Sequence, residues 1–301
     1  MDRTLLAHLP IVLAVHRRGG FAAAANELGM STSAVSHAVK SVEERLGQPL
    51  FARTTRSVRL TEAGAALVDV LGPALGEIST AVDDIGAARG KVGGTLRINA
   101  PRTALPIAVT PLLQEMGRRH PGLTVEITCD EGLADIVAEG YDAGIRLGHT
   151  VAQDMVAVRL TPPFEAIMVA SPGYLSARGE PGALEDLADH NCIGYRFVTS
   201  GAVYDWDLRG RGGDVAVSVN GTVRVTDALC AKELALADVG IAYLFEPLVR
   251  AELQAGSLRQ LLPRTAIEEP GLFLYFPRRA AQAPKLRAFI DLARELLASR
   301  R

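Results

Sequence analysis

The stretch of residues 20–60 constrains the fold of this chain more than any other, because start and stop signals for short helices follow one another closely there. Phe21 to Leu28 has the Ala-rich composition of a short helix, and Gly29 ends it. Ser31 or Thr32 is a good N-cap for a second helix. Two short helices joined by a tight, Gly-containing turn predict a helix-turn-helix.

The second helix, which is expected to run to about Leu46, has two unlike faces. Apolar residues recur at steps of four, three and four and predict the face that packs inward: Val35, Val39, Val42 and Leu46. The opposite face carries short or cationic groups that can meet base edges and phosphates: Ser33, Ser36, His37 and Lys40, with Ser31 and Thr32 at its start.

Two short apolar segments after this helix predict a two-stranded wing. They are Leu50-Phe51 and the run from Val58 to Leu60. The segment between them offers polar and cationic candidates for DNA contact: Arg53, Thr54 and Arg56. A structural helical pair with a solvated basic loop would give the same pattern, so the pattern alone leaves both interpretations open.

The run from Ala22 to Gly64 resembles the N-terminal winged helix-turn-helix of LysR-type transcriptional regulators. The residues that carry the resemblance keep the family's order and spacing: Ala23-Ala24, Leu28, Ser33-Ala34-Val35-Ser36, Glu43, Leu46-Gly47, Leu50-Phe51, Arg53 and Leu60-Thr61-Glu62-Ala63-Gly64. Many relatives carry Gln where this chain has Thr32. A Gln can bridge a base edge bidentately and a Thr cannot, so the resemblance does not carry base preference over at that position.

The distribution of charge supports a DNA-binding head. The net charge of the 301 residues is −2, but residues 1–62 hold 8 Lys and Arg against 5 Asp and Glu, which leaves 24 against 29 in the remainder. A basic head on an acidic body fits a protein that meets phosphate at one end. The length predicts two or three domains. Neither a secretory signal nor a membrane-spanning run is visible, so a cytoplasmic protein without a membrane partner is expected.

A long helix is predicted from Glu62 to Arg89, with a kink near Pro73. Its apolar positions form a heptad-like seam suited to pairing with a second subunit: Leu67, Leu71, Leu75, Ile78, Val82 and Ile85. Internal packing would give a similar stripe. The resemblance favours the family's dimerisation helix, in a homodimer or a dimer of dimers, and leaves contact with RNA polymerase open. Residues 90–95 would be the hinge.

From Leu96 onward strands and helices alternate, which implies a mainly parallel sheet with helices on its faces. The early expected elements are strands at 96–99, 124–128 and 143–146 and helices at 106–119 and 133–139. The later ones are strands at 156–160, 165–171, 192–196, 215–219 and 241–244, two short helices within 172–190, a hairpin containing Trp206, a helix at 227–237 and a final strand-helix pair over 272–299.

This second part resembles the effector-binding domain of the same family. The motifs are LRINAPRTA at 96–104, RRHPGLTVEI at 118–127, DAGIRLG at 142–148, ASPGYLSARG at 170–179 and ELALADVGIAYL at 233–244. The resemblance implies a multidomain protein: a mainly α winged helix-turn-helix head (1–61), a linker helix (62–89) and an α/β effector-binding domain (90–301) of two Rossmann-like subdomains. These would comprise about 95–163 with 270–301, and 164–269, joined by crossings near 162–165 and 267–271.

Strand ends and helix starts in an open α/β sheet predict where a small effector binds. Arg102-Thr103, His149 and Thr226-Asp227 occupy such places, although ordinary capping would also explain Thr226-Asp227. The resemblance adds Thr199 and Ser200 to Arg102, Thr103 and the 226–227 turn. Arg102 is the natural anion anchor. With the aromatic candidates Tyr204, Trp206 and Phe245 nearby, this lining favours a small carboxylate with an apolar body.

Several alternatives stay open at this point. Tyr204 and Trp206 would either roof an effector or fill the inner face of their hairpin, and Arg146 is expected to pair with an acid such as Asp142 or Asp135. The expected ligand is an effector of unknown identity, with no cofactor and no metal. The three cysteines, Cys129, Cys192 and Cys230, lack metal-ligand spacing, and a redox-sensing regulator is one alternative. An α/β enzyme is a remote one, because no catalytic motif is visible.

Overall fold

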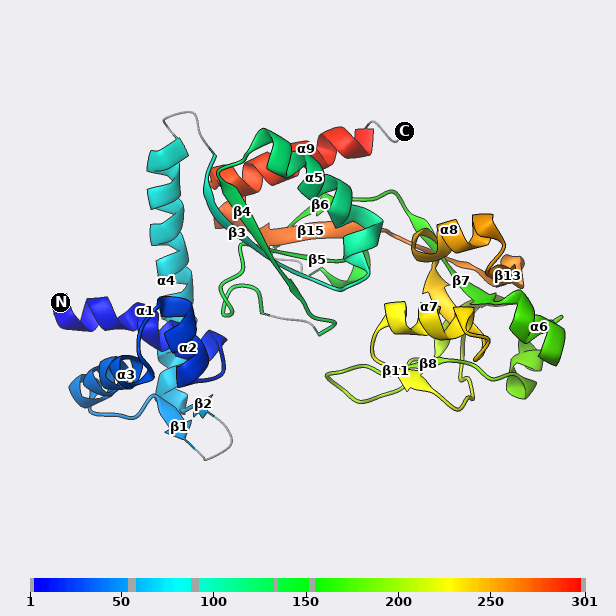
Figure 1. The fold of residues 1–301 in the computed structure, drawn as a ribbon, viewed down its shortest axis with the longest axis horizontal. Helices are drawn as coiled ribbons and strands as arrows, with labels where there is room; N and C mark the ends of the chain where they lie inside the picture. Colours follow the sequence, from blue (N-terminus) through cyan, green and yellow to red (C-terminus); the bar gives the residue numbers. More distant parts are fainter. Residues whose placement is uncertain (1–2, 54–57, 88–91, 133–134, 152–154, 299–301) are drawn as a thin grey trace. The chain divides into compact units, whose positions relative to one another are not determined.

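The computed structural model describes residues 3–53, 58–87, 92–132, 135–151 and 155–298. The chain divides into two units: residues 1–90 together with 135–142, and residues 91–134 together with 143–301 (Figure 1). The short segment 135–142 therefore counts with the N-terminal unit. The finer boundaries expected from the sequence stay predictions.

Three helices begin the N-terminal unit. The first is α1 (Arg3–Arg17), and it is followed by α2 (Phe21–Leu28) and α3 (Thr32–Leu46) at the places that the sequence predicts. Gly29 (φ 62°) ends α2 and Gly47 (φ 68°) ends α3, both in the left-handed conformation that glycine adopts without a Cβ clash. Ser31 is the N-cap of α3, because its Oγ accepts the N–H of Ala34 over 3.2 Å.

The inward face of α3 packs against α1 and α2 in one apolar cluster. Val35, Val39 and Val42 are buried there, as the sequence predicts, together with Val12 of α1 and Ala24 of α2. Leu46 is an exception: it is 45% exposed because it is the last residue of the helix, next to the turn at Gly47. The prediction of an inward Leu46 is therefore wrong.

The wing is an antiparallel pair of β1 (Phe51–Arg53) and β2 (Val58–Leu60), with Phe51 opposite Leu60. The Glu43 carboxylate of α3 accepts the N–H groups of Leu50 and Phe51 and so fixes where the wing begins. Beyond β2, the Thr61 hydroxyl accepts the N–H of Gly64 and donates to the Pro49 carbonyl. A Cβ at Gly64 would lie 2.1 Å from the Leu50 carbonyl oxygen, so this close approach requires glycine.

The long helix α4 (Glu62–Ala87) contains Pro73, and the expected kink there stays a prediction. Its apolar seam has two parts. Leu71 is buried against Leu13 of α1, while Leu67 and Leu75 pack at the edges of the same apolar clusters. Ile78 (60% exposed) and Val82 (63% exposed) face solvent, and the Ile85 side chain lies outside the described residues. The first half of the stripe thus includes internal packing.

The predicted helix over 133–139 does not form in its described part. Residues 136–140 make turns, and 133–134 lie outside the described residues. The Asp135 carboxylate accepts the N–H groups of Val137 and Ala138, and the Tyr141 N–H returns to the Ile136 carbonyl. The segment therefore closes on itself after one turn, which is too short to sustain a helix.

The second unit begins with a five-stranded sheet in the order β4-β3-β5-β15-β6, called subdomain I with its helices. β3 runs parallel to β4 and β5, but β15 is antiparallel to β5 and β6. Four of the five strands therefore run in the same direction, so the prediction of a mainly parallel sheet is confirmed for this sheet. Only β15 opposes them, because it arrives from the C-terminal segment in the opposite direction. The strands are β3 (Gly94–Ala100), β4 (Leu123–Cys129), β5 (Ala143–Leu147), β6 (Met155–Arg159) and β15 (Leu272–Pro277).

Two helices lie side by side over this sheet, α5 (Thr110–Arg119) and α9 (Pro284–Ala298), and bury Leu112 and Phe289 (Figure 1). A π-helical turn, η1 (Leu105–Val109), leads into α5. Short 3-10 turns, η2 (Gly148–Thr150) and η5 (Arg278–Gln282), complete this part.

Subdomain II is built around β7 (Phe164–Ala170), which pairs antiparallel with β12 (Ala242–Phe245), β13 (Arg259–Leu261) and β14 (Ile267–Glu269). Its hairpin is β9 (Trp206–Gly210) with β10 (Gly213–Val217), and β8 (Gly194–Tyr195) is parallel to β11 (Arg224–Val225). Its helical segments are α6 (Pro172–Arg178), η3 (Leu184–Asp189), α7 (Ala228–Leu236), α8 (Glu246–Ala255) and η4 (Pro263–Thr265).

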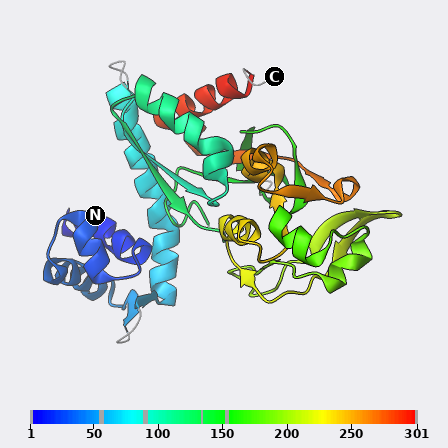
Figure 2. The same ribbon diagram turned by 45° about the vertical axis from the view of Figure 1, so that its right-hand side comes forward.

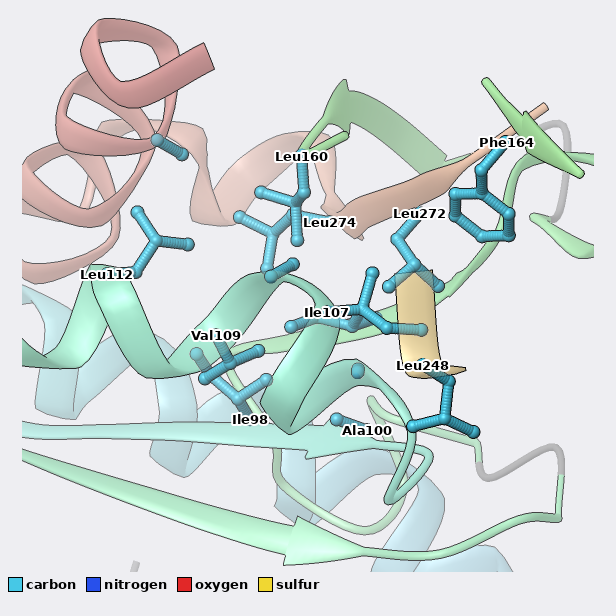
Figure 3. Close-up of a cluster of buried hydrophobic side chains, with 14 of the residues drawn as sticks. Ile98, Ala100, Ile107, Val109, Leu112, Leu160, Phe164, Leu248, Leu272 and Leu274 are labelled. Atoms are coloured by element: carbon cyan, nitrogen blue, oxygen red, sulfur yellow. The ribbon is translucent and has the colours of Figure 1, made fainter. Parts of the chain in front are cut away.

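Two neighbouring crossings join the subdomains, and the residue bounds that the resemblance implied for them stay predictions. The chain entering β7 and the chain between β14 and β15 run side by side (Figures 1 and 2). At the crossing the Leu272 N–H donates to Thr161 Oγ1 over 2.9 Å. One apolar cluster continues from subdomain I through the crossing, where Ile107, Leu272 and Leu248 lie near one another (Figure 3).

Candidate DNA-binding face and effector site

The outward face of α3 carries the polar residues that the sequence singled out. Ser31, Thr32, Ser33, His37 and Lys40 are exposed, and Ser36 is half-buried. The Ser31 and Ser33 hydroxyls lie 3.0 Å apart, so either oxygen can donate to the other. Because the apolar face of the same helix is buried, these groups stand on a rigid support.

Lys40 forms an ion pair with Glu44, one turn further along α3, at 3.4 Å. Both side chains are largely exposed, so this pair contributes little to stability and is screened by salt. The Lys40 ammonium can therefore exchange Glu44 for a phosphate at little cost. Of the expected wing residues, Thr54, Arg56 and the side chain of Arg53 lie outside the described residues.

Arg102 lies in the turn after β3, and its guanidinium forms an ion pair with Asp227 at 2.9 Å. Asp227 belongs to subdomain II, so this pair connects the two subdomains. The backbone N–H of Arg102 donates to Glu131 Oε1 over 2.9 Å, within subdomain I. The expected anion anchor is thus present, but its charge already has a partner.

Asp227 is the N-cap of α7, since its Oδ1 accepts the Leu229 N–H over 2.7 Å. Its other oxygen, Oδ2, is the one that meets Arg102. The capping role expected for this turn and the charge pairing are therefore both present, on different oxygens. The neighbouring Thr226 is exposed, and Thr103, which follows Arg102, is buried.

Two further side chains at this boundary were not predicted from the sequence: Glu131 and Tyr195. Burial raises the pKa of the Glu131 carboxyl, and the charge of Asp227 adds to this effect. Burial also raises the pKa of the Tyr195 hydroxyl to about 12, with further contributions from Glu131 and Asp227. Glu131 lies just beyond the carboxyl end of β4, so the strand-end rule could have identified it.

Thr199 also lies at this boundary, and both it and Ser200 on the same turn are exposed. A Cβ at Gly132 would lie 3.3 Å from Thr199 Cγ2, so the turn of subdomain II closely approaches the loop after β4. We call Arg102, Glu131, Tyr195, Thr199 and Asp227 the inter-subdomain cluster. His149 is elsewhere: its Nδ1 lies 3.6 Å from the Glu269 carboxylate.

The aromatic candidates are largely engaged with one another. Trp206 is only 1% exposed and stacks on Tyr243. It therefore fills the inner face of its hairpin, which is one of the two expected alternatives. Tyr204 stacks on the same ring, and burial together with its hydrogen bond to Asp207 raises the pKa of the Tyr204 hydroxyl. Phe245 is half-buried and packs against Phe164 at the crossing.

Arg146 does not pair with Asp142 or Asp135, and that prediction is wrong. Its guanidinium donates to Asn99 Oδ1 over 2.6 Å and to the backbone carbonyls of Ile145, Asp130 and Gly132. The side chain is buried, and oxygens at the end of the sheet surround it. Arg146 therefore stabilises the loop after β4 by donating to its backbone carbonyls.

The cysteine thiols do not favour a redox switch. Cys192 is buried, and burial raises the pKa of its thiol to about 12. Cys129 is exposed, yet partial desolvation raises the pKa of its thiol as well. A raised pKa lowers the fraction of reactive thiolate at neutral pH. Cys230 is exposed.

Within the described ranges, no helix is long and apolar enough to cross a membrane. In the same part of the chain, no group of three or more His, Cys, Asp or Glu side chains is arranged to hold a metal ion.

Family models match both parts of the chain. Residues 6–65 match the bacterial regulatory helix-turn-helix protein, lysR family, and residues 89–298 match the LysR substrate binding domain. The chain is 39% identical over 278 residues to an uncharacterized HTH-type transcriptional regulator of Escherichia coli K12, YcaN, covering 92% of this chain and 91% of that one. It is 35% identical over 291 residues to the HTH-type transcriptional regulator PgrR of the same organism, covering 97% of each.

Solved structures agree with these matches. The regulator CrgA from Neisseria meningitidis superimposes with a TM-score of 0.61 at 28% identity, covering 96% of this chain and 98% of that one. A full-length AphB variant shares the fold with a TM-score of 0.71 at 22% identity, covering 96% and 97%. The helix-turn-helix and the α/β domain together define a DNA-binding transcriptional regulator with a substrate-binding domain. The chain belongs to the LysR family of transcriptional regulators.

Proposed function

We propose that this regulator binds double-stranded promoter DNA through the outward face of α3, and that a small effector bound between the two subdomains modulates that binding. The observation that carries the DNA contact is a polar, cationic face held rigid by a buried apolar one. In this proposal the side chains on α3 read base edges and the wing holds the backbone: Ser31, Thr32, Ser33, Ser36, His37 and Lys40 on the helix, with Arg53, Thr54 and Arg56 on the wing.

Support for the effector site comes from the inter-subdomain cluster, which unites charged and polar groups from both subdomains. Such a site couples ligand occupancy to the arrangement of the subdomains, because a ligand that contacts both favours one arrangement. The proposed lining includes the predicted residues at or near this boundary: Arg102, Thr103, Thr199, Ser200, Thr226 and Asp227. His149, Tyr204, Trp206 and Phe245 have partners of their own and are secondary candidates.

The proposed assembly is a homodimer or homotetramer that pairs through α4. Ile78 and Val82 are large apolar side chains exposed on this helix, as is Val70. Two copies are needed because one helix-turn-helix reads only half of a palindromic site. The protein acts in the cytoplasm, without a cofactor or a catalytic activity, and contact with RNA polymerase at the promoter is a further part of this proposal.

The central test is selection of DNA from a random-sequence library by the full-length protein, followed by affinity measurements on the selected duplex. A Ser33→Ala, Ser36→Ala, His37→Ala triple variant should lose preference for the selected duplex over a scrambled one. The matched control is Ser176→Ala, Ser257→Ala in the second unit, which should keep that preference. If the triple variant keeps the wild-type preference, the residues that read the DNA sequence lie elsewhere.

A further inference from the structure

The ion pair between Arg102 and Asp227 is a contact between side chains that the sequence holds 125 positions apart. Arg102 follows β3 of subdomain I, and Asp227 begins α7 of subdomain II. The Arg102 side chain is 55% exposed, whereas that of Asp227 is 13% exposed. The cation is therefore open to solvent on one side and meets a sheltered carboxylate on the other.

Both partners are held in place independently of each other. The Arg102 backbone is fixed by its N–H bond to Glu131 Oε1. The Asp227 carboxylate is fixed by Oδ1, which accepts the Leu229 N–H, while Oδ2 meets the guanidinium. If the ion pair separates, the Asp227 charge keeps the N-terminal amides of α7 and their dipole as partners. Separation therefore does not leave an uncompensated carboxylate.

We propose that Asp227 is a built-in competitor of an anionic effector for the Arg102 guanidinium. This inference rests on the proposed effector site and specifies its chemistry: the effector carries an acid group that replaces the Asp227 carboxylate on Arg102. A carboxylate, sulfate or phosphate offers the same oxygen acceptors as Asp227, and an Arg guanidinium binds any of them.

The competition links binding to the arrangement of the subdomains. While Arg102 holds Asp227, the pair ties the two subdomains together. An external anion on Arg102 removes that tie, so the bound state and the free state differ in an inter-subdomain contact. A ligand with this differential interaction can shift the conformational equilibrium, whereas one that leaves the pair intact cannot act through it.

Asp227→Asn separates the two roles of this side chain. Asn keeps an Oδ1 that accepts the Leu229 N–H, so the cap is preserved, but it has no charge to hold Arg102. Asp130→Asn is the matched control. Asp130 precedes Glu131 and its Oδ1 accepts the Gly132 N–H, which Asn also allows, but no ion pair joins it to Arg102 within the described residues.

The experiment uses the full-length protein and sodium sulfate as the anion probe, with sodium chloride at equal ionic strength as the reference. Thermal unfolding is followed at increasing sulfate. The general stabilising effect of sulfate is common to all variants, so the difference between variants reports binding at Arg102. For Asp227→Asn the stabilisation should reach half its maximum at a sulfate concentration about five-fold lower than for wild type, the factor expected when a modest internal competitor is removed.

Asp130→Asn should respond to sulfate as wild type does. The Arg102→Gln, Asp227→Asn double variant should lose the increased sensitivity to sulfate that Asp227→Asn shows. Equal responses of wild type and Asp227→Asn, or a gain that persists in the double variant, would overturn the proposal. DNA is absent from this measurement. Failure of the DNA-binding function would instead appear as no enrichment in the library selection, so the two failures are distinguishable.

Discussion

The Glu43 carboxylate accepts the backbone N–H of Leu50 over 2.8 Å and that of Phe51 over 3.2 Å with the same oxygen. The reading helix and the first strand of the wing are thereby joined by a charge-assisted contact, which is stronger than a neutral hydrogen bond. Glu43 therefore helps to orient the wing, together with the Thr61 hydroxyl that donates to the Pro49 carbonyl.

Glu43→Ala should therefore destabilise the protein and weaken DNA binding together. Loss of the acceptor leaves two part-buried N–H groups without their partner, which costs about 1–3 kcal/mol for each such group. Glu43→Gln keeps a carbonyl oxygen at the same place and should lose much less. Thermal unfolding and affinity for the selected duplex measure the two effects, and equal behaviour of the Ala and Gln variants would contradict this role.

Lys40→Ala should weaken binding to all DNA sequences alike. Removal of one phosphate contact should reduce the slope of log affinity against log salt by about one. Lys232→Ala is the control, because Lys232 forms an ion pair with Glu252 in the second unit and should leave the slope unchanged. If the slope of the Lys40 variant equals that of wild type, Lys40 does not meet a phosphate.

Two glycines of α4 should respond in opposite directions to alanine. Gly64→Ala places a Cβ against the Leu50 carbonyl and should destabilise the protein by about 1–3 kcal/mol. A Cβ at Gly76 meets nothing within 4 Å, so Gly76→Ala should stabilise the helix by about 0.5–1 kcal/mol. Urea unfolding of both variants checks the signs. If Gly64→Ala is as stable as wild type, the backbone at Leu50 can shift away from the added Cβ.

Ile78→Asp with Val82→Asp should reduce the assembled mass while the protein stays folded, because both side chains are exposed in the single chain. Leu71→Asp should instead lower the unfolding temperature strongly, because Leu71 is buried against Leu13 and Val68. Light scattering and circular dichroism separate the outcomes. A double variant with native mass would place the subunit contact outside this part of α4.

Burial raises the pKa of the Glu269 carboxyl above its ordinary value of 4.5, although the nearby His149 opposes the shift. A carboxyl with a raised pKa in the folded state favours folding below pH 4.5 and loses that contribution as pH rises through the folded pKa. Glu269→Gln should thus be more stable than wild type at pH 7, and the difference should vanish below pH 4.5. The exposed neighbour provides the control, since Glu268→Gln should leave the pH dependence of the unfolding temperature unchanged.

Local signals predicted the N-terminal unit well, because its helices depend on caps, glycines and one apolar face that lie close together in the sequence. Ser31 and Gly29 each act within a few residues of their own position, and Val39 belongs to an apolar stripe whose short period is visible within one helix. The seam of α4 was harder to interpret: a stripe that packs inward at Leu71 and faces solvent at Ile78 has the same period throughout.

The local sequence pattern did not predict which side chains from distant segments contact each other. The sequence placed Arg102 and Asp227 among the candidates for one effector site but did not predict that they form an ion pair. Nothing near Arg146 indicates that Asn99 and three carbonyls will replace the expected acid. The direction of β15 in the sheet is also set by topology, since the chain must return through subdomain II before this strand can pair.

The position of β15 between β5 and β6 has a consequence for synthesis of the protein on the ribosome. Residues 155–159 form their ladder with residues 272–277, so β6 lacks that partner until more than a hundred further residues have been made. Subdomain II, by contrast, has all the strands of its main sheet once residue 269 has emerged. The later part of the chain can therefore fold first, and the sheet that begins earlier is completed last.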